Sequence, residues 1–199
     1  MKGELVVAHY KENVAWAKKA SDYKQWIYNK SGRFISGEIT VQNFGREAAT
    51  YLMHMRFNYG KPLAWTFFVQ GSPEPHISTG DMLTILAEWP NELRSGFNPS
   101  KGLHFFGHHP VIPVEQKAGG DDAANDVPGL WAALFESPMP ENMMFLPGAN
   151  FALSYDALKS RSVGFYHRAE YLASTRPRGP WEFERLWAYL WRPQDKPRL

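Results

Sequence analysis

The sequence has 199 residues, of which 44% are hydrophobic and 15% are aromatic. Such a chain is long enough for one domain with a buried core and too apolar to be disordered throughout. The absence of cysteine excludes disulfides, zinc-thiolate sites and thiol catalysis, and a net charge of +2 does not indicate a dedicated nucleic-acid binder. Because the apolar runs are too short for a signal peptide or a membrane helix, we expect a cytoplasmic protein without a membrane span.

The charges are unevenly distributed along the chain. Residues 1–60 carry nine Lys and Arg against five Asp and Glu, residues 61–156 carry four against eleven, and residues 157–199 carry nine against four. If the two basic ends meet in space, they would frame an anionic ligand. A solvated basic surface is an equally simple interpretation.

The first 70 residues alternate between predicted strands and helices. Strands are predicted at residues 4–9, 25–28 and 64–69, helices at residues 13–20 and 45–58, and a turn at residues 29–32. Four apolar residues of the second helix share one face at i, i+3, i+4, i+7 spacing: Ala48, Tyr51, Leu52 and Met55. The alternation predicts an α/β fold, with a mainly parallel twisted sheet flanked by helices.

The second half is less regular until residue 142. A helix is predicted at residues 79–88, and residues 90–128 are rich in Gly, Pro, Asn and Asp. Within that stretch, Gly119-Gly120-Asp121-Asp122 is the best candidate for a mobile loop or lid. A further strand is predicted at residues 150–154, with helices at 155–160, 163–174 and 181–191. We expect residues 1–192 to form one compact domain and residues 193–199 a flexible tail.

Polar segments follow each of the first three predicted strands. They are His9-Tyr10-Lys11-Glu12, Asn29-Lys30 and the stretch from Gln70 to His76. Because ligands of open α/β sheets bind beyond the carboxyl ends of the strands, these segments predict a ligand site. The alternative is that they are ordinary polar loops.

The segment Asn43-Phe44-Gly45-Arg46-Glu47 opens the predicted helix at residues 45–58. Backbone N–H groups at a helix start favour anions, and Arg46 offers a bidentate phosphate contact. The alternative is structural, with Asn43 as N-cap, Glu47 complementing the helix dipole and Arg46 solvated.

Acidic and histidine side chains elsewhere offer other chemistry. Glu74, His76 and Asp81 match no strong metal signature, and the histidines around residues 104–109 are as compatible with a substrate-lining loop as with a metal cluster. On the C-terminal helix, Glu182 and Glu184 are two residues apart. They therefore point in different directions, so at most one faces a site. Both could instead be helix-start acids that complement the dipole.

Common nucleotide and hydrolase motifs are absent. The sequence contains no Gly-x-Ser-x-Gly, no Walker-type Gly-Lys-Ser/Thr and no Gly-x-Gly-x-x-Gly. The usual sequence arguments for α/β hydrolases, P-loop enzymes and dinucleotide oxidoreductases therefore do not apply.

Six segments, taken in order, carry a family resemblance. They are Val6-Val7-Ala8-His9-Tyr10, Ile27-Tyr28-Asn29-Lys30, Asn43-x-Gly45-Arg46-Glu47-Ala48-x-Thr50-Tyr51-Leu52, Phe68-x-Gln70-Gly71-x-Pro73, Gly148-Ala149-x-Phe151-Ala152-Leu153-Ser154 and Glu184-Arg185-Leu186-Trp187. Over about residues 5–190 the chain resembles the domain of unknown function catalogued as DUF3431.

More distantly, the ordered features resemble glycosyltransferases of the GT-A fold. The segment at residues 43–47 is similar to one in polysaccharide-synthesis glycosyltransferases. Residues 148–153 followed by Glu184-x-Leu186-Trp187 are similar to the branching N-acetylglucosaminyltransferase and xylosyltransferase family, whose matching Glu is the catalytic base. The resemblance implies that role for Glu184. The residues expected to bind a nucleotide-sugar donor are His9, Tyr10, Glu12, Asn29, Lys30, Gly45, Arg46, Glu47, Gln70 and Gly71.

The chain departs from the GT-A pattern at one place. These enzymes usually carry Asp-x-Asp, which holds a divalent metal on the diphosphate, where this chain has Gln70-Gly71-Ser72. Either Glu74 or His76 substitutes as a ligand of Mn²⁺ or Mg²⁺, or basic side chains neutralise the leaving group without a metal. We favour the second, with no cofactor required. The basic residues in question are Arg161, Arg168, Arg176, Arg178 and Arg185.

The resemblance thus implies transfer of a sugar, with inversion, from a nucleotide-sugar donor to a hydroxyl acceptor on a glycan, a small molecule or a modified nucleobase. One alternative is a catalytically inactive module that binds a nucleotide or a glycan. Another is a glycosyltransferase acting on modified DNA bases, although the modest net charge speaks against tight duplex binding.

Overall fold

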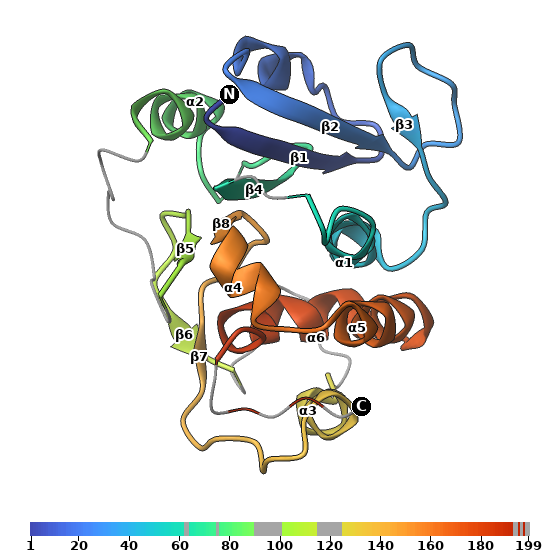
Figure 1. Cartoon of the computed structure of the whole chain (residues 1–199), viewed down its shortest axis with the longest axis vertical. Helices are drawn as coiled ribbons and strands as arrows, with labels where there is room; N and C mark the ends of the chain where they lie inside the picture. Colours follow the sequence, from blue (N-terminus) through green and yellow to red (C-terminus); the bar gives the residue numbers. More distant parts are fainter. Residues whose placement is uncertain are drawn as a thin grey trace.

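The computed structural model describes residues 1–61, 64–74, 76–89, 101–114 and 125–192, together with Asp195 and Pro197. Six strands form one sheet in the order β3-β2-β1-β4-β8-β5 (Figure 1). They are β1 (Gly3–His9), β2 (Tyr23–Asn29), β3 (Ile39–Thr40), β4 (Trp65–Gln70), β5 (Leu103–Phe105) and β8 (Phe151–Ser154). A separate two-stranded sheet pairs β6 (Ile112–Pro113) with β7 (Met144–Phe145).

Most of the large sheet is parallel. β1 pairs in parallel with both β2 and β4, and β2 pairs in parallel with β3. Only β8 departs from this direction, since it runs antiparallel to both β4 and β5. The predicted α/β class with a mainly parallel sheet is confirmed.

The central strand β1 explains how the sheet supports a core on each face. All seven of its residues are buried. Since successive side chains of a strand point to opposite faces, Leu5 and Val7 enter one apolar cluster while Val6 and Ala8 enter the other. A strand buried on both sides is typical of a parallel sheet covered by helices.

Helices cover both faces of the sheet, giving three layers (Figure 1). On one face lie η1 (Ala15–Lys19), a 3₁₀ helix, and α2 (Thr79–Glu88). The other face carries α1 (Arg46–Phe57), α5 (Val163–Thr175) and α6 (Gly179–Leu186), with α3 (Val127–Leu134), α4 (Tyr155–Lys159) and the 3₁₀ helix η2 (Trp187–Tyr189) packed in the same core. The result is one compact α/β/α domain.

Two predicted helices differ from the structure. The segment predicted as a helix at residues 13–20 forms only a five-residue 3₁₀ helix, in front of which the Asn13 side chain accepts a hydrogen bond from the Ala15 N–H (3.0 Å). The helix predicted at residues 181–191 begins earlier, at Gly179, and its α-helical part ends at Leu186. Further on, the carbonyl of Leu190 accepts a hydrogen bond from the buried Arg161 guanidinium.

Two expectations concern segments that are only partly described. The lid expected at residues 119–122 lies outside the described residues. Of the expected tail at residues 193–199, the structure describes Asp195 and Pro197. The Asp195 carbonyl accepts a hydrogen bond from Arg161, and Pro197 forms a β-bridge with Phe135.

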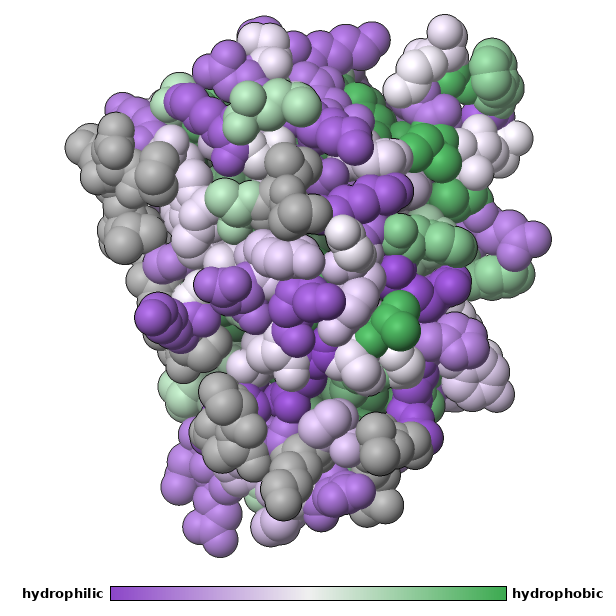
Figure 2. Space-filling model, viewed as in Figure 1, coloured by the Kyte–Doolittle hydropathy of each residue, from purple (hydrophilic) through white to green (hydrophobic). Residues whose placement is uncertain are grey.

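Several large apolar side chains are exposed beside the sheet edge formed by β3. Phe34 is 87% exposed and Phe44 is 59% exposed. Figure 2 shows green residues gathered on the side of the molecule where β3 and its neighbouring loops lie.

Within the part of the chain that the structure describes, no helix combines the length and hydropathy needed to cross a bilayer.

Candidate functional site

The order of the strands marks where a ligand site is expected. From β1 the chain steps to β2 and β3 on one side and returns to β4 on the other. In open α/β sheets the crevice beyond the carboxyl ends at such a reversal binds ligands. A pocket of about 490 Å³ lies here, with Gln70 at the end of β4 in its wall. Its volume falls in the range of roughly 300–1,000 Å³ typical of small-molecule sites.

The pocket is lined by two kinds of side chain. The polar residues are Arg46, Glu47, Gln70, His76, His109 and Glu184. The apolar residues are Pro110, Ile112, Pro147, Pro180 and Trp181. The fold therefore brings together four of the predicted site residues, which are separated by up to 138 positions in the chain: Arg46, Glu47, Gln70 and Glu184.

Glu184 reaches the pocket from α6. Its Oε1 atom accepts a hydrogen bond from the backbone N–H of Gly148 (2.5 Å). Burial raises the pKa of the Glu184 carboxyl above its ordinary value, and the nearby carboxylate of Glu47 raises it further. The Gly148 hydrogen bond and the charges of Arg185 and Arg46 oppose the shift without cancelling it. The pocket wall thus holds a carboxylate that binds protons more tightly than an exposed one.

The neighbouring carboxylate on α6 has a different environment. Glu182 is buried and accepts hydrogen bonds from Arg176 Nε (2.6 Å) and from the backbone N–H of Asp126 (2.9 Å). It does not line the pocket. The expectation that at most one of the two carboxylates faces a site agrees with this geometry.

Gly148 joins Glu184 to a histidine. Its φ is +101°, and a Cβ atom at this position would lie 2.7 Å from Cγ of His76. The imidazole therefore packs directly on the Gly148 backbone. Burial lowers the pKa of His76, and its Nδ1 atom is buried without a hydrogen-bond partner among the described residues. His76, a residue of the pocket wall, thus holds an unpaired ring nitrogen that is buried against the Gly148 backbone.

Arg46 begins α1 in an unusual backbone conformation. Gly45 has a φ of 58° and Arg46 a φ of 45°, and the N-cap is Gly45, which supplies no side-chain hydrogen bond. The alternative assignment of Asn43 as N-cap is therefore wrong. The Arg46 guanidinium lies 5.1 Å from the ring centroid of Trp181, and its Nε is 3.7 Å from a Glu47 carboxylate oxygen.

Lys30 stabilises the backbone at the start of α1 by hydrogen bonds. Its Nζ atom donates hydrogen bonds to the carbonyl of Phe44 (2.7 Å), to the carbonyl of Arg46 and to Thr50 Oγ1 (3.2 Å). Burial lowers the pKa of Lys30 to about 8. Predicted as a donor contact, Lys30 instead binds the protein's own main chain and does not line the pocket.

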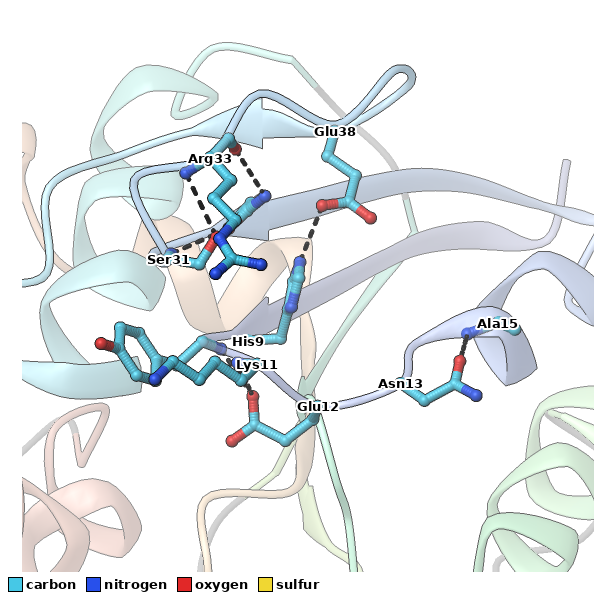
Figure 3. Close-up of polar contacts among 10 residues, drawn as sticks. His9, Lys11, Glu12, Asn13, Ala15, Ser31, Arg33 and Glu38 are labelled. Carbon is cyan, nitrogen blue, oxygen red and sulfur yellow. Dashed lines mark hydrogen bonds and ion pairs between the residues drawn. The ribbon is translucent and has the colours of Figure 1, made fainter.

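The predicted residues at the ends of β1 and β2 form a separate cluster, which Figure 3 shows. His9 Nε2 lies 2.9 Å from Glu38 Oε2. Glu12 turns back on its own loop and accepts hydrogen bonds from the N–H groups of Tyr10 (2.6 Å) and Lys11 (3.0 Å). The Asn29 side chain accepts a hydrogen bond from the Ser31 N–H (2.8 Å) and donates one to the Arg33 carbonyl (3.0 Å).

These residues lie beside the pocket without lining it. Gly71 connects the two regions, because a Cβ atom on it would lie 2.4 Å from the His9 Cβ, so only glycine permits this approach. Its carbonyl accepts a hydrogen bond from Trp16 Nε1 (3.1 Å). Tyr10 is 42% exposed.

The two residues considered as metal ligands have different surroundings. Glu74 Oε1 accepts a hydrogen bond from the N–H of Thr79 at the start of α2 (3.3 Å), whereas His76 lies in the pocket. Throughout the described ranges, no group of three or more His, Asp or Glu side chains is arranged to hold a metal ion.

The basic residues of the C-terminal segment also differ in their partners. Arg161 and Arg185 are buried and donate to backbone carbonyls, and Arg176 pairs with Glu182. Arg178 lies with its guanidinium 4.1 Å from the ring centroid of the pocket residue Trp181. Since α1 packs against α5 and α6, the basic ends of the chain do meet in space.

A comparison with protein families identifies the chain. The family model described as "Protein of unknown function (DUF3431)" matches residues 5–196. The chain belongs to the DUF3431 family. The resemblance expected from the sequence is thereby confirmed, and the match includes both β4 and α6, which supply Gln70 and Glu184 to the pocket. No curated protein and no solved structure matches this DUF3431 chain.

The apolar wall of the DUF3431 pocket was not predicted from the sequence. One signal was available on α6: Pro180, Trp181 and Glu184 stand at i, i+1 and i+4, a spacing that places Pro180 and Trp181 over the same face as Glu184. Residues 110, 112 and 147 carry no comparable signal, because tertiary packing alone brings them to α6.

Proposed function

We propose that this DUF3431 protein is a GT-A-like glycosyltransferase that transfers a sugar, with inversion, from a nucleotide-sugar donor to a hydroxyl acceptor. One observation carries the proposal. The Glu184 carboxyl has a raised pKa and stands in the wall of a pocket at the carboxyl edge of the parallel strands. A base of this kind is what deprotonation of a sugar acceptor needs.

The reaction assigns one role to each group. The Glu184 carboxylate takes the proton of the acceptor hydroxyl while the acceptor oxygen forms a bond to the anomeric carbon of the donor. The bond from that carbon to the phosphate oxygen breaks, and the nucleoside diphosphate leaves with the electron pair. Arg46 stabilises the charge that develops on it, and Glu184 then passes its proton to water.

Unpaired polar atoms on two residues of the pocket wall support a ligand rich in hydrogen-bonding groups. Within the described residues, Gln70 Oε1 and His76 Nδ1 are buried without partners. Leaving a buried polar atom unpaired costs about 1–3 kcal/mol, so a ligand that pairs these atoms recovers that energy. The hydroxyl groups of a donor sugar would do so.

The positive charges near the pocket support a reaction without a metal ion. Arg46 and Arg178 both stack on Trp181, so two guanidinium groups stand at one pocket-lining ring. One guanidinium group can bind two phosphate oxygens at once, and it stays positively charged at physiological pH. The two guanidinium groups fit a diphosphate leaving group better than Glu74 and His76 fit a metal.

The decisive experiment compares two neighbouring carboxylates. Purified protein is incubated with a panel of nucleotide sugars, with and without Mn²⁺, and release of nucleoside diphosphate is measured. We expect slow hydrolysis of one donor without acceptor, and loss of at least about 100-fold in rate for Glu184→Gln, the usual size of a general-base contribution. Thermal stabilisation of Glu184→Gln by the donor should remain.

Glu182→Gln is the matched control, because Glu182 lies on the same helix and its carboxylate is bound to Arg176 outside the pocket. Its rate per folded molecule should equal that of the wild type. Unchanged turnover in Glu184→Gln would contradict the assignment of the base. Donor binding without any turnover in the wild type would instead favour the inactive binding module.

A further inference from the structure

The apolar side of the pocket belongs to one packed unit that includes the base. Arg185 connects its parts: Nε donates to the Val114 carbonyl (3.2 Å), just after β6, and the guanidinium lies 5.0 Å from the Phe145 ring on β7. The Val114 N–H in turn donates to the Met143 carbonyl (2.8 Å). The β6–β7 ribbon is thereby held against α6, the helix that carries Glu184.

Pro180 and Trp181 lie one turn before Glu184 on α6 and line the same pocket. Residues three and four positions apart on a helix share a face. A base must touch the hydroxyl that it deprotonates, so the surfaces beside Glu184 are those that contact the rest of the acceptor.

The apolar wall of the pocket offers little hydrogen bonding. Its members are Pro110, Ile112, Pro147, Pro180 and Trp181, and the indole N–H of Trp181 is their only polar side-chain group. In the proposed reaction the polar side chains of the pocket serve the donor, with Arg46 at the diphosphate and Gln70 and His76 at the donor sugar. The His109 ring packs edge-on against His76 (5.1 Å).

This composition discriminates between acceptors. A glycan carries several hydroxyl groups, each of which loses water on binding and needs a partner in the site. Proline rings and an indole instead provide rigid apolar surfaces that pack against rings and alkyl groups without loss of side-chain entropy in the prolines.

Resting on the proposed transferase function, we infer that the acceptor is an alcohol carried on an aromatic or alkyl group, and that the surface formed by Pro110, Ile112, Pro147, Pro180 and Trp181 selects it over polar sugars. Glu184 takes the proton of its single hydroxyl, whose oxygen attacks the anomeric carbon as the nucleoside diphosphate departs.

The test compares acceptors with the donor that the protein hydrolyses. Benzyl alcohol and 2-phenylethanol represent apolar acceptors, and glucose and maltose represent sugars. We expect kcat/KM to be at least about tenfold higher for the aryl alcohols. The variant Ile112→Gln adds a hydrogen-bonding group to the apolar surface, so the ratio of aryl to sugar kcat/KM should fall by about tenfold.

Ile35→Gln is the control, because Ile35 is 40% exposed beside β3 and does not line the pocket. It should keep the wild-type ratio. Acceptor-free donor hydrolysis combined with a preference for glucose or maltose would overturn the inference and leave the transferase function standing. An unchanged ratio in Ile112→Gln would also overturn it, whereas absence of donor turnover and donor binding would overturn both proposals.

Discussion

Glu184 and Lys30 are both ionisable side chains withdrawn from water, and each has a pKa shifted towards its neutral form. Their hydrogen bonding differs. Lys30 donates to three oxygen atoms of the α1 start, so its charge is well compensated and its role is to hold the backbone of Arg46. Glu184 accepts one backbone N–H and faces another carboxylate, Glu47. The less compensated charge is the one suited to chemistry.

The raised pKa of Glu184 makes a prediction about stability. The folded state binds this proton more tightly than the unfolded state, so wild-type stability falls as pH rises from the ordinary carboxyl pKa of 4.5 through the raised value. Glutamine does not titrate. We therefore expect Glu184→Gln to be more stable than the wild type at pH 7, with the difference shrinking as the pH falls towards 4.5 and constant below it. Urea unfolding at several pH values measures this, and a pH-independent difference would contradict it.

At the scale of elements, α6 and the segment before β8 are joined by Gly148. The positive φ of this residue and its contact with His76 leave no room for a side chain. Its N–H also orients the Glu184 carboxylate. One glycine thus fixes both a pocket histidine and the proposed base.

Gly148→Ala should therefore be costly. A residue forced into a positive φ loses about 1–3 kcal/mol, and the Cβ contact with the His76 ring adds to this. We expect a lower free energy of unfolding by at least about 2 kcal/mol and a reduced transfer rate. Gly60→Ala is the control, since a Cβ atom there meets nothing within 4 Å. Its effect should stay within about 0.5 kcal/mol, and equal effects in the two variants would refute the packing argument.

Elements with long periodic patterns were predictable. The four residues expected on one face of α1 are all buried, and α2 spans the predicted residues. In contrast, α3 was missed, although Asp126 caps it by accepting from the Gly129 N–H (2.8 Å) and Pro128 stands in its first turn. Gly129 inside the helix and the Gly- and Asp-rich stretch before it weaken the local helical pattern.

At the scale of the whole molecule, buried Arg161 ties the C-terminal segment to the domain. Its guanidinium donates to the carbonyls of Leu190, Arg192 and Asp195. Its burial makes these bonds costly to lose, because three carbonyls would be left without their donor. Leu190, Arg192 and Asp195, which follow η2, are thus held in the folded structure.

Arg161→Met keeps much of the side-chain volume and removes these donors. We expect the free energy of unfolding to fall by about 3 kcal/mol or more, at about 1 kcal/mol for each carbonyl. Hydrogen exchange should also increase in residues 187–192 before it increases in β1. Arg33→Met, at an exposed position, should change stability by less than about 0.5 kcal/mol. A similar small loss in Arg161→Met would show that the C-terminal segment is not held by this residue.

The order of the sheet also belongs to this scale. Phe151 on β8 pairs with Phe68 on β4 and with Phe105 on β5, so β8 inserts between two strands that precede it in the chain. Local periodicity predicts that residues 150–154 form a strand, but strand order depends on contacts between distant residues. The antiparallel direction of β8 was not predictable for the same reason.

What the sequence by itself determined is the local chemistry: an alternation of strands and helices that makes an α/β protein, DUF3431 membership, and polar residues at the ends of the strands. The alternation and the polar strand ends follow from patterns within a few residues of each other, and the family membership follows from six such segments in order along the chain. Only the tertiary structure decided which polar residues share a pocket. It placed Glu184 beside Arg46, Glu47 and Gln70, while His9, Glu12, Asn29 and Lys30 bind the protein itself. The physical reason is that a side chain's partners are set by packing between segments far apart in the chain, which no local pattern encodes.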